Sequence, residues 1–325
     1  MQKMSVNYLR ISVTDRCNLR CTYCNPLGAC DLIAHEEILT FEEIQRLVGL
    51  LAGCGIRKVR LTGGEPLVRK GIAELVRRLA DISGIEEVTL TTNGVLLAAM
   101  AAELKAAGAT RVNVSVDSMN RETYQQMTGS DALPESLAGI HKAIEVGLTP
   151  VRINSVIVKG FNDSPEQIGA LARMSIDLPV AVRFIEFCPT GAHPVVENGY
   201  VPNSEVRRIL EHEFGLLSPV LAGDMDGPAV YFKARDSAGM IGFISGRSSI
   251  FCQTCNRLRL TSDGKIKPCL YAAPAYDLKG LLRSGAGDEQ LRDLLRTIVR
   301  GKGQFTRVNS AVEEFKKFSM QSIGG

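Results

Sequence analysis

The first half of the chain alternates between short β-rich runs and longer amphipathic helical patterns. The candidate strands are Leu9–Val13, Lys58–Leu61, Glu87–Thr91, Arg111–Val116, Arg152–Val158 and Val180–Phe187. The candidate helices between them are Thr40–Leu51, Ile72–Ala80, Leu96–Ala107, Pro134–Val146 and Pro165–Met174. A Thr40-x-x-Glu43 capping box opens the first of these helices. Six β/α units in series predict an α/β fold built on a parallel sheet, and six is fewer than the eight units of a closed TIM-type barrel.

After about residue 187 the alternation stops, and Pro189–Pro194 has the composition of a connector. The elements expected beyond it are a helix at Ser204–Glu213, short strands at Ala229–Phe232, Met240–Ile244 and Arg257–Leu260, and a helical segment at Asp288–Val299. We therefore expect two domains, a barrel over residues 1–190 and a small domain over residues 191–325 that caps the barrel mouth.

Composition excludes several classes of function. With 45% apolar and 22% charged residues the chain has ample material for a buried core, and its net charge of +3 gives no reason to expect a nucleic-acid partner. Apolar stretches such as Val95–Met100 are far shorter than the roughly 20 residues that span a bilayer, so no membrane segment is expected. A polar N-terminus and an odd number of cysteines, nine, fit a reducing cytoplasm.

Three cysteines stand close together near the N-terminus, namely Cys17, Cys21 and Cys24. Three thiolates on one short loop suit three irons of a 4Fe–4S cluster and leave the fourth iron open for chemistry. Zinc modules use a second pair of ligands that is missing here, although Cys30 is a possible fourth ligand for a structural metal or a disulfide set.

A second set lies far downstream and consists of Cys252, Cys255 and Cys269. Alone, its C-x2-C pair would also be compatible with half of a zinc site. Two sets of three cysteines in one chain favour two 4Fe–4S clusters, each with an open iron.

The C-x3-C-x2-C spacing, with Tyr23 before its third cysteine, resembles the radical S-adenosylmethionine (SAM) superfamily. Gly63-Gly64-Glu65-Pro66 follows the second candidate strand, where such barrels place active-site residues. The resemblance implies a partial, open (β/α)6 TIM-type barrel whose open iron chelates SAM and whose electron cleaves it to a 5'-deoxyadenosyl radical. It also implies SAM contacts at four positions: Tyr23, Gly64, Ser115 and Cys188, the last being usually methionine in the family.

Arginines stand at or beside strand ends and ligand loops. They are Arg10, Arg60, Arg152 and the pair Arg257 and Arg259. A guanidinium fork binds phosphate oxygens in bidentate fashion, although any single surface arginine is ordinarily solvated. Arg257 and Arg259 are more informative, because alternation on a strand places both on one face beside the second cysteine set.

Across nearly its whole length the chain resembles the GTP 3',8-cyclase family. The matching segments are Arg10–Cys24, Arg60–Pro66, Thr91–Gly94, Cys252–Arg259 with Cys269, and the final Gly324 and Gly325. The resemblance implies conversion of GTP to (8S)-3',8-cyclo-7,8-dihydroguanosine 5'-triphosphate, the first step of molybdenum cofactor biosynthesis. In that reaction hydrogen is abstracted from C3' of GTP, and C3' then attacks C8 of guanine.

The same resemblance implies roles for individual residues. GTP contacts are implied at Arg10, Arg60, Thr91, Arg152, Arg257, Leu258 and Arg259. The second cluster holds guanine, and the tail residues Gly324 and Gly325 reach into the active site and support catalysis. The family usually carries lysine in place of Arg152 and methionine in place of Asn25.

The family further suggests an electron donor such as flavodoxin, product hand-off to the next enzyme of the pathway, and a homodimer. Two other functions stay open at this point. One is a radical SAM enzyme that modifies a precursor peptide and carries an auxiliary cluster. The other is a non-catalytic iron–sulfur scaffold or sensor, from which SAM binding would distinguish an enzyme.

Overall fold

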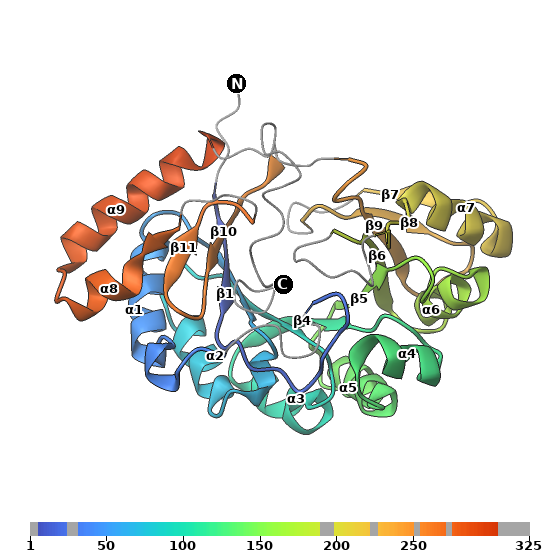
Figure 1. The fold of residues 1–325 in the computed structure, drawn as a ribbon, viewed down its shortest axis with the longest axis horizontal. Coiled ribbons are helices and arrows are strands. Elements are labelled where there is room, and N and C mark those ends of the chain that lie inside the picture. The colour runs from blue at the N-terminus through green and yellow to red at the C-terminus, as the bar shows by residue number, and fades with distance from the viewer. Residues whose placement is uncertain are drawn as a thin grey trace.

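A computed structural model describes residues 6–24, 32–188, 198–221, 227–249, 254–270 and 275–304. Within these ranges the strands form one curved sheet in the order β12-β11-β10-β1-β2-β3-β4-β5-β6-β9-β8-β7. Helices cover its convex side, and the strands line the concave side (Figure 1). The two terminal strands of this order do not pair with each other, so the barrel is open.

Six parallel strands form the centre of the sheet. They are β1 (Tyr8–Ser12), β2 (Lys58–Thr62), β3 (Glu87–Thr92), β4 (Ala109–Ser115), β5 (Val151–Ile157) and β6 (Val180–Glu186). The helices that follow them are α1 (Phe41–Ala52), α2 (Ile72–Ala80), α3 (Leu97–Ala106), α4 (Arg121–Thr128), α5 (Leu133–Glu145) and α6 (Pro165–Asp177). The expected α/β class and open parallel barrel are confirmed.

Local sequence explains these elements. Thr40 and Glu43 form the expected capping box, in which each side chain accepts a hydrogen bond from the backbone N–H of the other residue. Along each central strand, alternate side chains such as Val112 and Val114 are fully buried in the core under the helices. The residues between them therefore face the concave side of the sheet.

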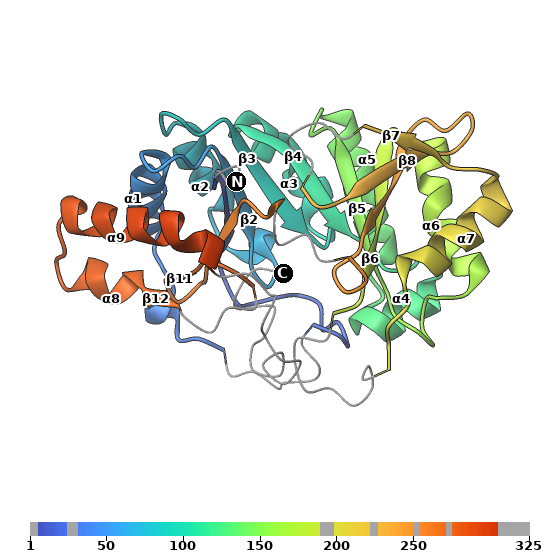
Figure 2. The same cartoon turned by 90° about the horizontal axis from the view of Figure 1, so that it is seen from above.

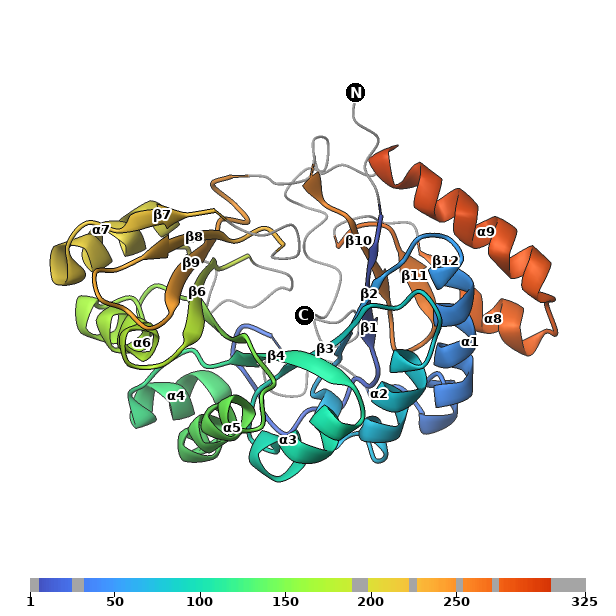
Figure 3. The same ribbon diagram turned by 180° about the vertical axis from the view of Figure 1, so that it is seen from behind.

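The strands of the C-terminal part belong to the same sheet as the barrel strands. They continue the barrel sheet at both edges, with β10 (Arg257–Leu260), β11 (Lys265–Lys267) and β12 (Tyr276–Asp277) on the β1 side. On the β6 side lie β9 (Met240–Ile244), β8 (Val230–Lys233) and β7 (Ser218–Val220). Figures 2 and 3 show the accompanying helices at opposite ends of the molecule, α7 (Asn203–Phe214) beside α6, and α8 (Leu278–Arg283) and α9 (Asp288–Gly301) beside α1. The reason is that β10 and β9 each pair in parallel with an edge strand, β1 and β6 respectively.

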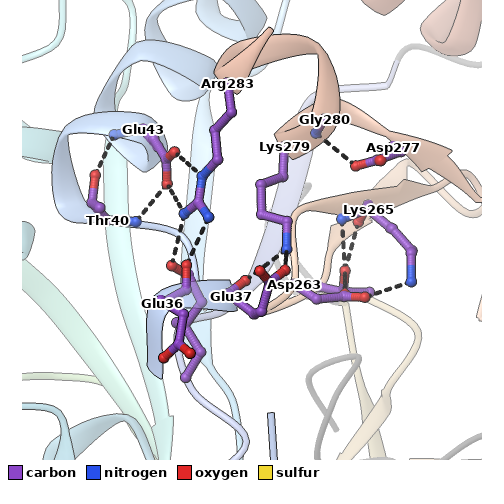
Figure 4. A network of polar contacts seen from close by, with 12 residues as sticks. Glu36, Glu37, Thr40, Glu43, Asp263, Lys265, Asp277, Lys279, Gly280 and Arg283 are labelled. Atoms are coloured by element: carbon purple, nitrogen blue, oxygen red, sulfur yellow. Dashed lines mark hydrogen bonds and ion pairs between the residues drawn. The ribbon is translucent and has the colours of Figure 1, made fainter. Parts of the chain in front are cut away.

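An ion-pair network fastens α8 to the start of the barrel (Figure 4). Arg283 donates to both carboxylate oxygens of Glu43, at 2.7 and 3.1 Å, and to the carbonyl of Glu36 at 2.6 Å. Lys279 pairs with Glu37 on the same segment. The network links residues about 240 positions apart in sequence and holds the C-terminal helices on α1.

Several sequence expectations lie outside the described residues. They include the domain boundary at residue 190, together with Asn25, Cys30, Cys252, Gly324 and Gly325. Among the helices of the described ranges, none combines the length and apolar character that crossing a bilayer requires.

Candidate active site

The first cysteine set lies on the loop that follows β1, at the carboxyl end of the barrel. The backbone N–H groups of Arg20 and Thr22 donate to the carbonyls of Thr128 and Met127, each at 2.8 Å, so the loop is anchored on the end of α4. Cys17, Cys21 and Cys24 are all partly buried on this loop.

Gly63 and Gly64 allow the next strand's loop to approach the cysteine loop closely. The Gly64 N–H donates to the carbonyl of Thr14 at 2.7 Å, and Glu65 N–H donates to that of Arg16 at 2.8 Å. A Cβ at Gly64 would lie 2.3 Å from the Arg16 carbonyl oxygen, and one at Gly63, whose φ is +150°, would lie 2.4 Å from that of Thr14. Only glycines fit this contact.

Glu65 connects this turn to the end of β3. Its buried carboxylate accepts hydrogen bonds from Thr92 Oγ1 at 2.7 Å and from the N–H of Asn93 at 2.7 Å. Burial raises the pKa of Glu65 to about 7 despite these bonds. The Asn93 amide in turn donates to Asn18 Oδ1 at 2.7 Å and faces the Cys17 sulfur at 4.0 Å. The turn and the cysteine loop are thus held as one unit.

The three thiols suit an iron–sulfur cluster by their chemistry. Burial, with the charges of Cys24, Asp117 and Cys17, raises the pKa of Cys21 well above its usual value. Neighbouring thiolates therefore need bound cations, which a cluster's irons supply. Within the described ranges no three or more His, Cys, Asp or Glu side chains are placed to hold a single metal ion. In a cluster each thiolate binds a different iron, so the thiols need only border one shared volume.

The expected SAM positions gather at the same end of the barrel. Tyr23 donates from its hydroxyl to the buried carboxylate of Asp117 at 2.5 Å, which fixes the segment beside Cys24. Ser115 is the last residue of β4 and is partly buried. Cys188 follows β6, and its sulfur lies beside Gly246, where a Cβ would be 3.2 Å away.

The concave face of the sheet carries a concentration of positive charge. Strand register places Arg10 beside Arg60 on one side and Arg259 on the other. The same face carries further basic residues on neighbouring strands: Lys58, Arg111, Arg152, Arg183 and Arg257. Glu87 is the acidic partner that pairs with Lys58 and Arg111, each at 2.9 Å. Positive charge therefore exceeds negative charge on this face, as a polyanion site requires.

The crowding of charge shifts several pKa values. Although burial opposes the shift, Arg60, Arg10, Lys58 and Arg257 lower the pKa of Tyr8 to about 8. Burial lowers the pKa of Lys58 to about 8 and, together with neighbouring charges, that of Arg152 to about 9. A bound anion would relieve this repulsion.

The described cysteines of the second set, Cys255 and Cys269, lie at the opposite end of the barrel from the first set. Cys255 stands two residues before Arg257, which pairs with Tyr8 at the start of β1. Cys269 follows β11, which runs antiparallel to β10 and so returns to that same end. Burial raises the pKa of Cys255, but Arg257 and Lys302 outweigh it and bring the value to about 7. This thiol therefore ionises readily, as a metal ligand should.

Of the other expected GTP contacts, Thr91 lies on the same face and Leu258 does not. Thr91 is partly buried, and its hydroxyl accepts a hydrogen bond from Arg60 at 3.4 Å. Leu258 points away from this face and is fully buried in the core, so only its backbone is available to a ligand. The residues of the basic face that were not predicted from sequence include Tyr8, Lys58, Arg111 and Arg183. Their alternation with apolar residues is the local signal for them, but it does not show that the strands bring them to one face.

Comparison with known proteins agrees with this geometry. Residues 11–172 match the model of the Radical SAM superfamily, and residues 180–307 match that of Molybdenum Cofactor Synthesis C. The chain is 47% identical to a GTP 3',8-cyclase of Moorella thermoacetica over 98% of both chains. It is also 47% identical to a GTP 3',8-cyclase of Pelotomaculum thermopropionicum over 89% of both.

Solved structures support the fold. Streptococcus suis SuiB bound to S-adenosylmethionine aligns with a TM-score of 0.64 at 17% identity, covering 99% of this chain and 77% of that one. Methylornithine synthase (PylB) aligns with a TM-score of 0.51 at 21% identity, covering 65% and 63%. At these identities the likeness establishes the fold alone. On the evidence of the sequence relatives, the chain belongs to the GTP 3',8-cyclase family of the radical SAM superfamily.

Proposed function

We propose that this chain is a GTP 3',8-cyclase that converts GTP to (8S)-3',8-cyclo-7,8-dihydroguanosine 5'-triphosphate, the first step of molybdenum cofactor biosynthesis. The observation that carries the proposal is the basic concave face, with Cys17, Cys21 and Cys24 at one end of the barrel and Cys255 and Cys269 at the other. A substrate on that face would lie between the two sets. A triphosphate supplies the negative charge that this face lacks.

In this proposal Arg10, Arg60 and Arg259 bind the triphosphate. Their side chains occupy one row across three adjacent strands, so several phosphate oxygens can be bound at once. Lys58 and Arg183 extend the basic surface on either side, and Arg183 is held in place by Asn154 Oδ1 at 2.9 and 2.6 Å. Thr91 and Arg152 complete the contacts toward the carboxyl end.

At the carboxyl end, Cys17, Cys21 and Cys24 would hold a 4Fe–4S cluster, and Tyr23, Gly64, Ser115 and Cys188 would contact SAM. The bound cluster and SAM together supply a 5'-deoxyadenosyl radical. In this proposal the residues of the concave face position C3' of GTP for hydrogen abstraction. The Gly63–Gly64 contact with Thr14 and Arg16 keeps the cysteine loop and the SAM-binding turn at a fixed separation.

A second 4Fe–4S cluster on Cys252, Cys255 and Cys269 would hold guanine at the amino end. Arg257, two residues after Cys255, supports the assignment because its charge lowers the pKa of Cys255 against the effect of burial. Gly324 and Gly325 would reach the same site. Deleting both glycines should leave the iron content unchanged and abolish cyclisation, whereas normal turnover by the truncated protein would contradict this role.

Turnover also needs an electron donor such as flavodoxin, and the product would pass to the next enzyme of the pathway. A homodimer, a cytoplasmic location and the division into domains 1–190 and 191–325 stay predictions.

The test of the proposed function is anaerobic. Protein reconstituted with iron and sulfide receives SAM and dithionite, and 5'-deoxyadenosine is measured by mass spectrometry with and without GTP. Release that depends on GTP, together with a cyclised nucleotide, is the expected result. Release that ignores GTP would favour a peptide-modifying enzyme, and no SAM cleavage in cluster-loaded protein would favour a scaffold or sensor.

A further inference from the structure

Asn113 is a polar side chain on the concave face that the proposed function leaves without a role. It lies in the middle of β4, between Val112 and Val114, both of which are fully buried under the helices. Asn113 therefore faces the concave side. It is only 3% exposed, and its amide oxygen has no hydrogen-bond partner among the described residues.

A buried amide oxygen without a partner is costly. Leaving such an acceptor unsatisfied costs about 1–3 kcal/mol, so native structures seldom keep one unless a ligand or water completes it. The strand neighbours of Asn113 are Thr91 on β3 and Arg152 on β5. Both belong to the proposed GTP site, so a ligand bound there would lie beside Asn113.

The level of Asn113 along the barrel indicates which part of the ligand it meets. Arg111, two residues toward the amino end of β4, lies on the basic face beside Glu87. Ser115, two residues toward the carboxyl end, is the expected SAM contact. Strand geometry separates each of these from Asn113 by about 7 Å. Asn113 thus stands between the proposed phosphate-binding residues and SAM.

The chemistry of the proposed reaction places the ribose at that level, because C3' must lie next to the 5' carbon of SAM. We propose that Asn113 accepts a hydrogen bond from a ribose hydroxyl of GTP and so selects ribonucleotides and orients C3'. This inference rests on the proposed function. It assigns to Asn113 a substrate contact that neither the charge of the face nor the cysteine sets would supply.

The test measures nucleotide binding to the cluster-loaded enzyme by anaerobic calorimetry, using GTP, 2'-deoxyGTP, 3'-deoxyGTP and ITP. Wild-type protein should bind one of the two deoxynucleotides about 10-fold more weakly than GTP, the loss expected for one unsatisfied buried hydrogen bond. Asn113→Ala should bind GTP about 10-fold more weakly than wild type does. The variant should bind GTP and that same deoxynucleotide with equal affinity, because the hydroxyl no longer has a partner to lose. Gln126→Ala, which removes an exposed amide side chain on α4, is the matched control and should behave as wild type.

The wild-type comparison of GTP with its analogues needs no variant, so it decides the matter even if Asn113→Ala folds poorly. Equal wild-type affinity for GTP and both deoxynucleotides would overturn the inference. It would also be overturned if Asn113→Ala still bound the deoxynucleotide about 10-fold more weakly than GTP, because the two losses would then be independent. If Asn113→Ala instead removed a difference in affinity between GTP and ITP, Asn113 would contact guanine, and the ribose contact would be overturned. Failure of wild-type protein to bind GTP at all would overturn the proposed substrate and this inference together.

Discussion

Replacing Gly64 by alanine should separate the SAM-binding turn from the cysteine loop. The added Cβ would lie 2.3 Å from the carbonyl oxygen of Arg16 and 2.6 Å from its carbonyl carbon. Both neighbouring atoms are backbone, so neither can rotate away. Overpacking of this kind costs about 1–3 kcal/mol. Two hydrogen bonds, from Gly64 and Glu65 to the cysteine loop, would also stretch, at about 1 kcal/mol each.

The total destabilisation expected for Gly64→Ala is therefore about 3–5 kcal/mol, concentrated at the loop that carries Cys17 and Cys24. The measurements are chemical denaturation of the apoprotein, iron content after reconstitution, and SAM affinity. Gly49→Ala is the control, because a Cβ at this exposed position in α1 meets nothing within 4 Å. That change should be neutral or stabilise the helix by up to about 1 kcal/mol. Wild-type stability, iron content and SAM affinity in Gly64→Ala would refute the close contact.

Three further predictions follow from the basic face and the ion-pair network. Arg60→Ala should weaken GTP binding about 10- to 100-fold in calorimetry, because it removes a charge-assisted contact. The control is Arg77→Ala, whose ion pair with Glu74 is exposed and which should bind GTP as wild type does. Equal GTP affinity of Arg60→Ala and wild type would contradict the phosphate site. GTP affinity should fall as pH rises through about 8, because Tyr8 and Lys58 both lose a proton near that pH and both losses reduce positive charge. A binding titration from pH 6.5 to 9.5 should show a shallower fall for Tyr8→Phe, and identical slopes would argue against this origin. Arg283→Ala should lower the free energy of unfolding by about 1–2 kcal/mol, since Arg283 bonds to a carboxylate and to backbone carbonyls; urea denaturation that shows no change would indicate that the network does not hold α8 on α1.

Helices and strands that have a strong local sequence pattern were predicted accurately. The strand Met240–Ile244 and the helix Ile72–Ala80 have the expected bounds, and the Thr40 capping box starts α1 as predicted. The helix α4, Arg121–Thr128, was missed because it is short and mostly polar, so it lacks a strong apolar period.

Long-range pairing could not be predicted from local pattern. The parallel pairing of β10 with β1 brings Arg257 beside Tyr8, about 250 positions away in sequence, and it places Cys255 at the opposite end of the barrel from the first cysteine set. The composition of the basic face depends on the same information. Lys58 and Arg183 alternate with apolar residues on their strands, but only the assembled sheet shows that they share a face with Arg10.

The measurement that tests the central claim most directly follows the hydrogen atom. GTP deuterated at C3' is supplied to cluster-loaded enzyme with SAM and reductant, and the 5'-deoxyadenosine is analysed by mass spectrometry. If the concave face holds GTP with C3' beside SAM, deuterium should appear in 5'-deoxyadenosine and a cyclised triphosphate should accumulate. Release of unlabelled 5'-deoxyadenosine from GTP-saturated enzyme, without a nucleotide product, would contradict the account.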